Sequence, residues 1–335
     1  MQKIRGATMR SYTWKHLVLL VLAGAAVLGE AVYIVSLKVR THPEDMAARL
    51  PEQIVFGRAS DDIIEAGAMF TPVNDHAKPI AIIWIHGWGV NFYQPTYVGI
   101  GRELAARGYT VISANTRMHD LGNVEAWRWG KRIRGGGYWG VETEEVRDIA
   151  GWIDFAESCG LKRVILVGHS AGWAAVREYQ AEKQDPRVEG LVLASGNVNP
   201  ELQRVDPDQF AEATHLVAKG ESDALIRDPK RSFPSYISAA TLLDIANLPT
   251  TSKDFFGAQT PNAGITRVHC PVLAFFGTRS DVGTGADLDR LKSTIERQTT
   301  GPSLVTTALI RGADHMYTGQ EAQVAEVIAR WAEAL

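Results

Sequence analysis

Cysteine is almost absent from this chain. Its 335 residues include two cysteines, Cys159 and Cys270, which lie far apart in the sequence. A disulfide framework needs several cysteine pairs, and a zinc site needs clustered cysteine and histidine ligands. Neither cysteine lies in such a cluster. The sequence therefore predicts neither a disulfide-stabilised fold nor a cysteine-based metal site, and we expect no metal and no other cofactor.

An excess of one charge is also missing. The 35 Lys and Arg residues nearly balance the 38 Asp and Glu residues, which gives a formal net charge of −3. Nucleic-acid-binding domains usually carry a clear basic excess. The glycine-rich segment 135–137 lacks the Lys-Ser/Thr ending of a phosphate loop, so it indicates a tight turn or a flexible segment. We expect no nucleic-acid or nucleotide partner.

A long apolar stretch occurs near the N-terminus. Thirteen apolar residues, 17–29, follow several basic ones, as in a signal peptide with Ala23-Gly24-Ala25 as a cleavage signal. The apolar pattern resumes after Glu30, and the whole span 17–37 is long enough to cross a bilayer as a retained anchor. The continuing pattern favours the anchor. In either case the basic residues before the apolar stretch are expected to stay in the cytoplasm, and the chain after the stretch is expected to lie outside it.

The rest of the chain has the pattern of one domain. Residues 1–40 form the leader, and residues 41–59 are predicted to be a linker with a first edge element, because Pro43 and Pro51 break any helix. Residues 60–335 alternate strand and helix patterns, which predicts an α/β fold with a mainly parallel sheet covered on both faces. Strands are expected at 80–85, 110–114, 164–167, 188–195, 271–277 and 304–310, and helices at 142–158 and 319–334.

The most informative motif is GHSAG at residues 168–172. A buried run, 164–167, precedes it, and small residues that begin a helix follow. A G-x-S-x-G sequence between a strand and a helix is typical of the nucleophile elbow of α/β-hydrolases. The turn forces the serine into a strained backbone conformation, and the glycines allow close packing. Ser170 is therefore the predicted nucleophile, whereas His169 is expected to pack rather than to act as a base.

A serine nucleophile needs a base and an orienting acid, which follow it in this fold in the order acid, then histidine. Asp281 follows the predicted strand 271–277, and His315 follows the predicted strand 304–310. We predict His315 as the base and Asp281 as the acid. Other carboxylates remain candidates for the acid: Asp314, Glu201 and Asp206.

An oxyanion site is expected upstream. The apolar run 80–85 leads into the sequence HGWG, which starts at His86. Esterases of this fold place a backbone N–H of this loop opposite the N–H that follows the nucleophile. The donors here are predicted to be Trp88 and Ala171, which need no reorientation as negative charge develops on the carbonyl oxygen. His86 is expected to be structural.

These motifs, in this order, resemble the serine α/β-hydrolase superfamily over residues 60–335. The segments 115–120 and 135–138 are also similar to an esterase-like subgroup. One departure concerns the acid, which lies four residues after Gly277 where three is the commoner spacing. The resemblance implies an α/β-hydrolase fold and hydrolysis of carboxylic esters through an acyl-enzyme on Ser170, without a cofactor.

The same residues leave other activities open. A triad of this kind also serves thioesterases, amidases and acyltransferases, and the sequence does not choose among them. Relatives with dehalogenase or epoxide hydrolase activity carry Asp at the elbow, so Ser170 disfavours those reactions. A non-catalytic binding module is the alternative from another class, and the apparently complete triad argues against it.

Two segments interrupt the strand–helix pattern and are expected to shape the substrate pocket. The first is 118–140, with a solvated basic run at 131–134, and the second is a cap insertion at 200–268, with short helices near 232–236 and 239–248. An aromatic-lined cleft would suit a small ester with a bulky or aromatic group, although some of these aromatic residues are expected to pack the core. The aromatic candidates are Trp88, Trp127, Trp129, Tyr138, Trp139 and Trp173. The sequence does not set the oligomeric state.

Overall fold

The computed structural model describes most of the chain after residue 51. Residues 51–335 form one compact unit. The predicted leader lies outside the described residues, as do Trp127, Trp129 and Glu201. No helix within the described part of the chain is long and apolar enough to span a membrane. The described residues are 52–72, 77–126, 132–196, 198, 205–227, 236–298 and 300–335.

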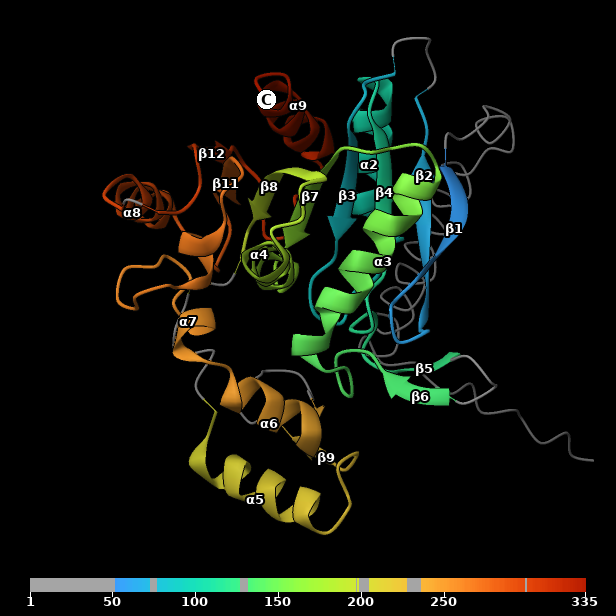
Figure 1. Ribbon diagram of the computed structural model, residues 1–335, viewed down its shortest axis with the longest axis vertical. Coiled ribbons are helices and arrows are strands. Elements are labelled where there is room, and N and C mark those ends of the chain that lie inside the picture. The colour runs from blue at the N-terminus through green and yellow to red at the C-terminus, as the bar shows by residue number, and fades with distance from the viewer. Residues whose placement is uncertain are drawn as a thin grey trace, which may run out of the picture. The chain divides into compact units, whose positions relative to one another are not determined.

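An eight-stranded sheet forms the centre of this unit (Figure 1). Its strand order is β1-β2-β4-β3-β7-β8-β11-β12. β2 pairs antiparallel with both β1 and β4, and all other neighbours pair in parallel. The strands are β1 Glu52–Arg58, β2 Ile64–Phe70, β3 Ala81–Ile85, β4 Thr110–Ala114, β7 Val164–His169, β8 Val188–Ala194, β11 Val272–Gly277 and β12 Val305–Ile310. The predicted mainly parallel α/β sheet is confirmed.

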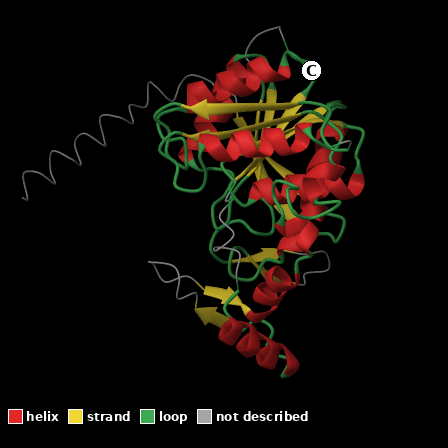
Figure 2. Ribbon diagram, turned by 90° about the vertical axis from the view of Figure 1, so that its left-hand side faces the viewer, coloured by secondary structure: helices red, strands yellow, loops and turns green. Residues whose placement is uncertain are grey.

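Helices cover both faces of the sheet (Figures 1 and 2). Every residue of β3, β4, β7 and β11 is buried, as expected for strands that are covered on both sides. One face packs against α3 Glu145–Ser158, α4 Gly172–Lys183 and α8 Gly285–Glu296. The other face packs against α2 Pro95–Ala106 and α9 Glu321–Ala332. The parallel strands therefore end at one common edge, where the loops carry the predicted site residues.

Within the segment predicted to hold a linker and a first edge element, residues 52–58 form strand β1, which lies at the edge of the sheet. β1 pairs with β2 along its whole length. The indole of Trp152 in α3 lies against Gly57, where an added Cβ would come within 2.8 Å of the ring. Burial alternates over residues 54–58, but the exposed positions include the apolar Ile54 and Phe56, so apolar and polar residues do not alternate along the strand.

The insertion between β8 and β11 forms a cap with its own small core. α5 begins with Asp206 as its N-cap and Pro207 at its first position, a favourable start for a helix. Ala213, Ile226 and Leu242 pack together in the cap core. The cap elements are α5 Pro207–Ala218, β9 Leu225–Arg227, β10 Tyr236–Ser238, α6 Ala239–Asn247, α7 Thr250–Lys253 and the 3-10 helix η4 Gly264–Arg267.

One expectation for the pocket-shaping segments needs correction. Tyr236 begins strand β10 rather than ending a helix, because residues 236–238 pair with β9. Segment 118–140 contains a hairpin of β5 Asn123–Ala126 and β6 Arg132–Gly135, which is separate from the central sheet. A short 3-10 helix, η2 Glu142–Glu144, then leads into α3. The helix predicted from Ala239 is confirmed as α6.

Candidate active site

Ser170 lies in a sharp turn between β7 and α4. Its φ angle is +55°, in the left-handed region that L-residues other than glycine, Asn and Asp rarely adopt. An added Cβ at Gly168 would lie 2.2 Å from the Gly172 carbonyl oxygen, and one at Gly172 would lie 2.5 Å from the His86 carbonyl oxygen. Side chains at either position would therefore force the strand and the helix apart. The Ser170 N–H donates to the Ala194 carbonyl oxygen at 2.9 Å, which fixes the turn against β8.

His315 lies beside Ser170 although 145 positions separate them in the chain. The His315 Nε2 atom is 3.1 Å from Ser170 Oγ, a distance at which the hydroxyl donates to the imidazole. Burial lowers the pKa of His315, while the charges of Asp281 and Asp314 act in the opposite direction. The lowered pKa favours the neutral ring, which is the form that accepts a proton.

The candidates for the orienting acid differ in their exposure and in their hydrogen bonds. Asp281 is exposed, and its charge raises the pKa of His315 more than that of Asp314 does. The side chain of Asp314 accepts a hydrogen bond from the Thr318 N–H at 2.9 Å, and Asp206 caps helix α5. The buried Nδ1 atom of His315 has no hydrogen-bond partner among the residues that the structure describes. The structure thus brings Ser170 and His315 together, but neither nearby carboxylate accepts a hydrogen bond from Nδ1.

The loops that carry Asp281 and His315 lie side by side. The Thr278 N–H donates to the Ile310 carbonyl oxygen at 3.0 Å, and the Arg279 N–H donates to the Ala313 carbonyl oxygen at 2.9 Å. The pairing between the two loops thus continues two residues past the end of β11. Asp281 lies beyond this pairing, at the fourth position after the strand, which accounts for its exposure.

The loop after β3 packs directly against Ser170. An added Cβ at Gly87 would lie 2.7 Å from Ser170 Cβ, so only glycine allows this approach. His86 Nε2 accepts a hydrogen bond from the Thr116 N–H at 3.0 Å, and therefore His86 Nδ1–H donates to the Gly87 carbonyl oxygen at 2.7 Å. Burial lowers the pKa of His86 to about 4, which keeps this ring neutral. These contacts agree with the structural role expected for His86.

The two predicted oxyanion donors differ in how they are held. The Trp88 N–H belongs to the same planar peptide group as the Gly87 carbonyl, so the hydrogen bond from His86 also sets the direction of this N–H. Ala171 is the N-cap residue of α4. The first N–H groups of a helix have no acceptor within the helix, so they are available to a ligand. Both donors therefore belong to segments that flank Ser170.

A polar network that the sequence did not reveal lies behind His86. The Thr116 hydroxyl donates to a Glu145 carboxylate oxygen at 2.7 Å. Burial raises the pKa of Glu145 to about 8. Arg117, which follows Thr116 in the sequence, forms an ion pair with Asp148 at 2.8 Å and also pairs with Asp61 and Glu144. The only sequence signal was a polar segment after a predicted strand, followed by an acidic helix start.

Aromatic side chains join the loop after β3 to the cap. The Trp88 Nε1–H donates to the Gly137 carbonyl oxygen at 3.0 Å, and its ring lies 6.5 Å from that of Tyr138. Tyr138 in turn contacts Trp139 at 5.7 Å and Tyr236 of the cap at 6.0 Å between ring centroids. All four side chains are partly exposed. They form what we call the aromatic cluster: Trp88, Tyr138, Trp139 and Tyr236.

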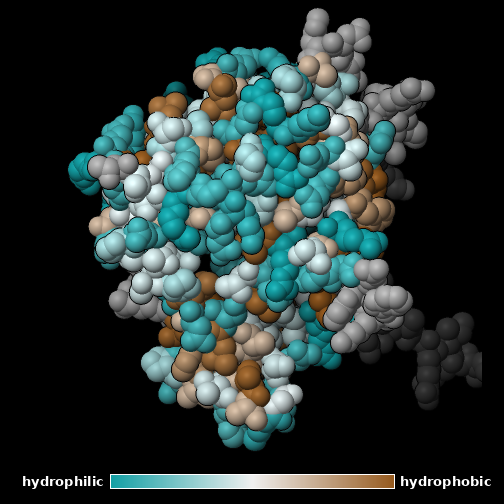
Figure 3. Space-filling model, viewed as in Figure 1, coloured by the Kyte–Doolittle hydropathy of each residue, from teal (hydrophilic) through white to brown (hydrophobic). Residues whose placement is uncertain are grey.

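Trp173 does not belong to this cluster. It is 1% exposed and stacks on Phe276 of β11, with ring centroids 5.8 Å apart. Its expected place in the cleft is wrong, and the alternative of core packing holds. The cap itself is bound to the segment after β6, where the Ser238 N–H donates to the Tyr138 carbonyl oxygen at 2.7 Å. Apolar residues gather on the cap in Figure 3, and Phe210, Val217 and Leu225 are among its exposed ones.

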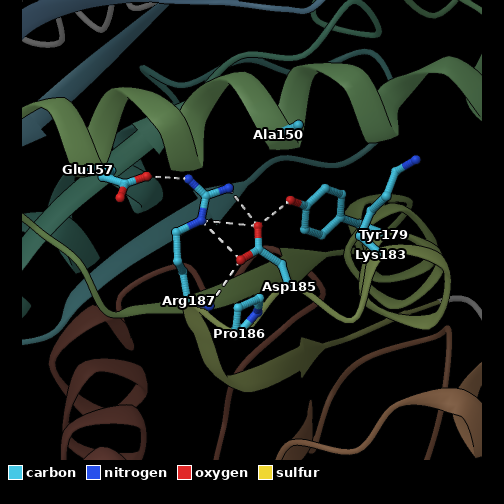
Figure 4. A pocket seen from close by; sticks show the side chains of 7 residues that line it. All are labelled: Ala150, Glu157, Tyr179, Lys183, Asp185, Pro186 and Arg187. Carbon is cyan, nitrogen blue, oxygen red and sulfur yellow. Dashed lines mark hydrogen bonds and ion pairs between the residues drawn. The ribbon is translucent and has the colours of Figure 1, made fainter.

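A cavity of about 420 Å³ lies elsewhere on the surface (Figure 4). Tyr179 and Lys183, in the C-terminal half of α4, contribute to its lining. Arg187 pairs with Asp185 and Glu157 there, and the Tyr179 hydroxyl donates to Asp185. Ser170 precedes the N-terminus of α4, and a helix of this length extends about 18 Å. The cavity is therefore separate from the site around Ser170.

Together, the parallel sheet, the strained serine turn and the adjacent histidine define an α/β hydrolase. The sequence profile of the Alpha/beta hydrolase family matches residues 82–327, and the chain belongs to this family. A comparison with curated proteins found no match. Among the described residues, no group of three or more His, Cys, Asp or Glu residues is arranged to hold a metal ion.

Several solved esterase structures have the same fold. Est1E from Butyrivibrio proteoclasticus is 14% identical, with 84% of this chain and 98% of that chain covered and a TM-score of 0.58. The esterase domain of a Rhodothermus marinus protein is 16% identical, with 84% and 97% covered and a TM-score of 0.52. Esterase Pf2001 from Pyrococcus furiosus is 15% identical, with 87% and 96% covered and a TM-score of 0.52.

Proposed function

We propose that this protein is a serine hydrolase that cleaves carboxylic esters through an acyl-enzyme on Ser170. The observation that carries the proposal is the 3.1 Å contact between Ser170 Oγ and His315 Nε2, with Ser170 in a strained turn. Backbone strain at a polar side chain is typical of functional sites. The family membership and the esterase fold of the similar structures support the same chemistry.

In the proposed mechanism, His315 Nε2 removes the hydroxyl proton as Ser170 Oγ attacks the ester carbonyl carbon. The N–H groups of Trp88 and Ala171 stabilise the negative oxygen that forms. His315 then gives its proton to the departing alcohol, which leaves the acyl group on Ser170. Water, deprotonated by His315, attacks the acyl carbon, releases the acid and restores the Ser170 hydroxyl.

Asp281 is the proposed orienting acid. It is favoured over Asp314 because its charge has the larger effect on the pKa of His315, whereas Asp314 accepts a hydrogen bond from Thr318. Its role is to hold the Nδ1–H tautomer of His315 and to stabilise the imidazolium that forms during the reaction. The buried Nδ1 atom is the position at which its carboxylate acts.

The proposed substrate is a small ester with a bulky apolar or aromatic group. The aromatic cluster supports this class, because its partly exposed rings extend from the oxyanion loop to the cap. Aromatic side chains stack favourably on other rings at centroid distances of about 4.5–7 Å. Est1E, which has a similar fold, is also known in a structure with bound ferulic acid.

We also propose that the catalytic domain lies outside the cytoplasm, held by residues 17–37 as a retained membrane anchor. Basic residues before the apolar span, and its length, support this orientation. Mass spectrometry of the mature N-terminus tests the anchor. An intact leader is expected, and a chain that starts near residue 26 would show that the leader is a cleaved signal peptide.

Hydrolysis of matched p-nitrophenyl esters, thioesters and anilides tests the activity. The series should run from acetyl to long-chain and benzoyl groups, with S170A as the control. We expect ester hydrolysis that S170A abolishes and a preference for bulky or aromatic groups over acetyl. Faster turnover of thioesters or amides would overturn the ester assignment, and a preference for acetyl alone would overturn the substrate class.

A further inference from the structure

The residue next to the nucleophile contacts the backbone of the base. His169 Nε2 lies 2.8 Å from the His315 carbonyl oxygen, and the two rings lie 4.9 Å apart. A carbonyl oxygen accepts hydrogen bonds and cannot donate them, so Nε2 carries the proton of this contact. His169 is fully buried, and its position in β7 is fixed by the sheet.

Tyr97, a residue of helix α2, fixes the tautomer of His169. The Tyr97 hydroxyl of α2 lies 2.6 Å from His169 Nδ1. Burial lowers the pKa of His169 to about 3, so the ring is neutral, and its Nδ1 atom accepts the hydrogen bond from Tyr97. Tyr97 and His169 thus connect helix α2 to the backbone of His315.

The loop around His315 is also held at other points, since the Gly312 N–H donates to Thr278 Oγ1 at 2.8 Å and the Arg279 N–H donates to the Ala313 carbonyl oxygen at 2.9 Å. Gly312, Tyr317 and Gly319 all have positive φ angles, so the loop is irregular on both sides of the histidine. The Tyr317 hydroxyl donates to Ser195 Oγ at 2.6 Å, which anchors the far side of the loop. The side chain of His315 is held at Nε2 by Ser170, while Nδ1 has no hydrogen-bond partner among the described residues. Among these restraints, the contact with His169 acts directly on the backbone of His315.

We infer that His169 is a positioning residue that sets the distance between the base His315 and the nucleophile Ser170, with Tyr97 holding the tautomer that this role requires. The inference rests on the proposed function, in which His315 is the base. It gives His169 a role beyond packing. Because a displacement of about 1 Å in a catalytic group can reduce the rate about 100-fold, loss of this contact is expected to lower kcat.

Two substitutions of His169 distinguish a role in positioning His315 from a role in packing alone. In H169Q the side-chain amide reaches the place of Nε2 and can still donate to the His315 carbonyl. In H169N the shorter amide reaches only the place of Nδ1, next to Tyr97. We expect H169Q to keep kcat within about fivefold of the wild type and H169N to lose about 100-fold, with similar KM values. The rate of Ser170 labelling by a fluorophosphonate should follow kcat.

The melting temperature is the control for folding. Each variant leaves one buried polar partner unpaired, so both should lose similar stability while differing in kcat. Equal kcat values for folded H169Q and H169N would overturn the inference. If H169N does not fold, Y97F provides the test: it removes only the hydroxyl that holds Nδ1, and an unchanged kcat would overturn the inference as well. A wild-type protein that neither hydrolyses esters nor reacts with the probe would instead contradict the proposed function.

Discussion

The Nε2 atom of His315 lies 3.1 Å from Oγ of Ser170, whereas Nδ1 of the same ring has no hydrogen-bond partner in the described part of the chain. For Nε2 to accept the serine proton, the neutral ring must carry its own proton on Nδ1. A nearby carboxylate favours this tautomer and stabilises the protonated ring. The candidate acids can therefore be separated by their effects on His315.

The first prediction concerns these acids. We expect D281N to lower kcat/KM by about three to four orders of magnitude, as loss of an orienting carboxylate does in other serine hydrolases. D314N is the matched control, since Asp314 accepts a hydrogen bond from Thr318, and it should stay within about tenfold of the wild type. Initial rates with a p-nitrophenyl ester measure both. A larger loss in D314N than in D281N would move the acid to Asp314.

The same two variants should change the pH profile. Negative charge at Asp281 and Asp314 raises the pKa of His315, with the larger effect from Asp281. Removal of either charge therefore moves the acidic limb of kcat/KM to lower pH, and the larger shift is expected for D281N.

The second prediction concerns the oxyanion loop. His86 Nδ1–H donates to the Gly87 carbonyl and thereby directs the Trp88 N–H. H86N can keep this donor, whereas H86Q keeps only the acceptor for the Thr116 N–H. If Trp88 is an oxyanion donor, H86Q should lower kcat about 100-fold with little change in KM, while H86N retains most activity. Steady-state kinetics of both variants provide the measurement, and equal losses in the two would argue against this role for His86.

The third prediction concerns stability against pH. Burial raises the pKa of Glu145 to about 8 from its ordinary value of 4.5. The folded state therefore holds a proton that the unfolded state has already lost at neutral pH. Its contribution to stability is complete below about pH 4.5 and falls as the pH rises towards 8, by at most about 1.4 kcal/mol per pH unit.

E145Q should make the dependence of stability on pH smaller, because glutamine stays neutral and can still accept the hydrogen bond from the Thr116 hydroxyl, while Glu142, whose pKa is raised to about 7 by burial, still contributes. Urea unfolding at pH 7 and pH 8 gives the slope for each protein. Between these values histidine is largely neutral in both states, so the buried histidines contribute little. A slope in E145Q as steep as in the wild type would assign the pH dependence to another group.

Local constraints made the elbow predictable. The tight turn at Ser170 requires glycine at positions 168 and 172, so the glycine spacing in the sequence predicts the strand–turn–helix geometry. The regular strands were predictable for a similar reason, since strands covered on both faces are continuous apolar runs. A first edge element was expected within 41–59, but the bounds of β1 were not, because Ile54 and Phe56 are apolar and yet exposed.

Long-range packing explains the other differences. Trp173 lies in the core because Phe276, a residue of a distant strand, provides a ring to stack on. The contact of Thr116 with Glu145 depends on how a loop meets the start of a helix, which no local pattern specifies. The position of Asp281 depends on where the pairing between two loops that are distant in the sequence ends, which no local pattern specifies.

The most direct test of the central claim is labelling of the full-length protein with a fluorophosphonate, followed by peptide mass spectrometry. The account predicts one rapid modification on Ser170, lost in S170A, and accompanied by a matching loss of ester hydrolysis. Folded wild-type protein that remains unlabelled at Ser170, or that is labelled equally in S170A, would contradict it.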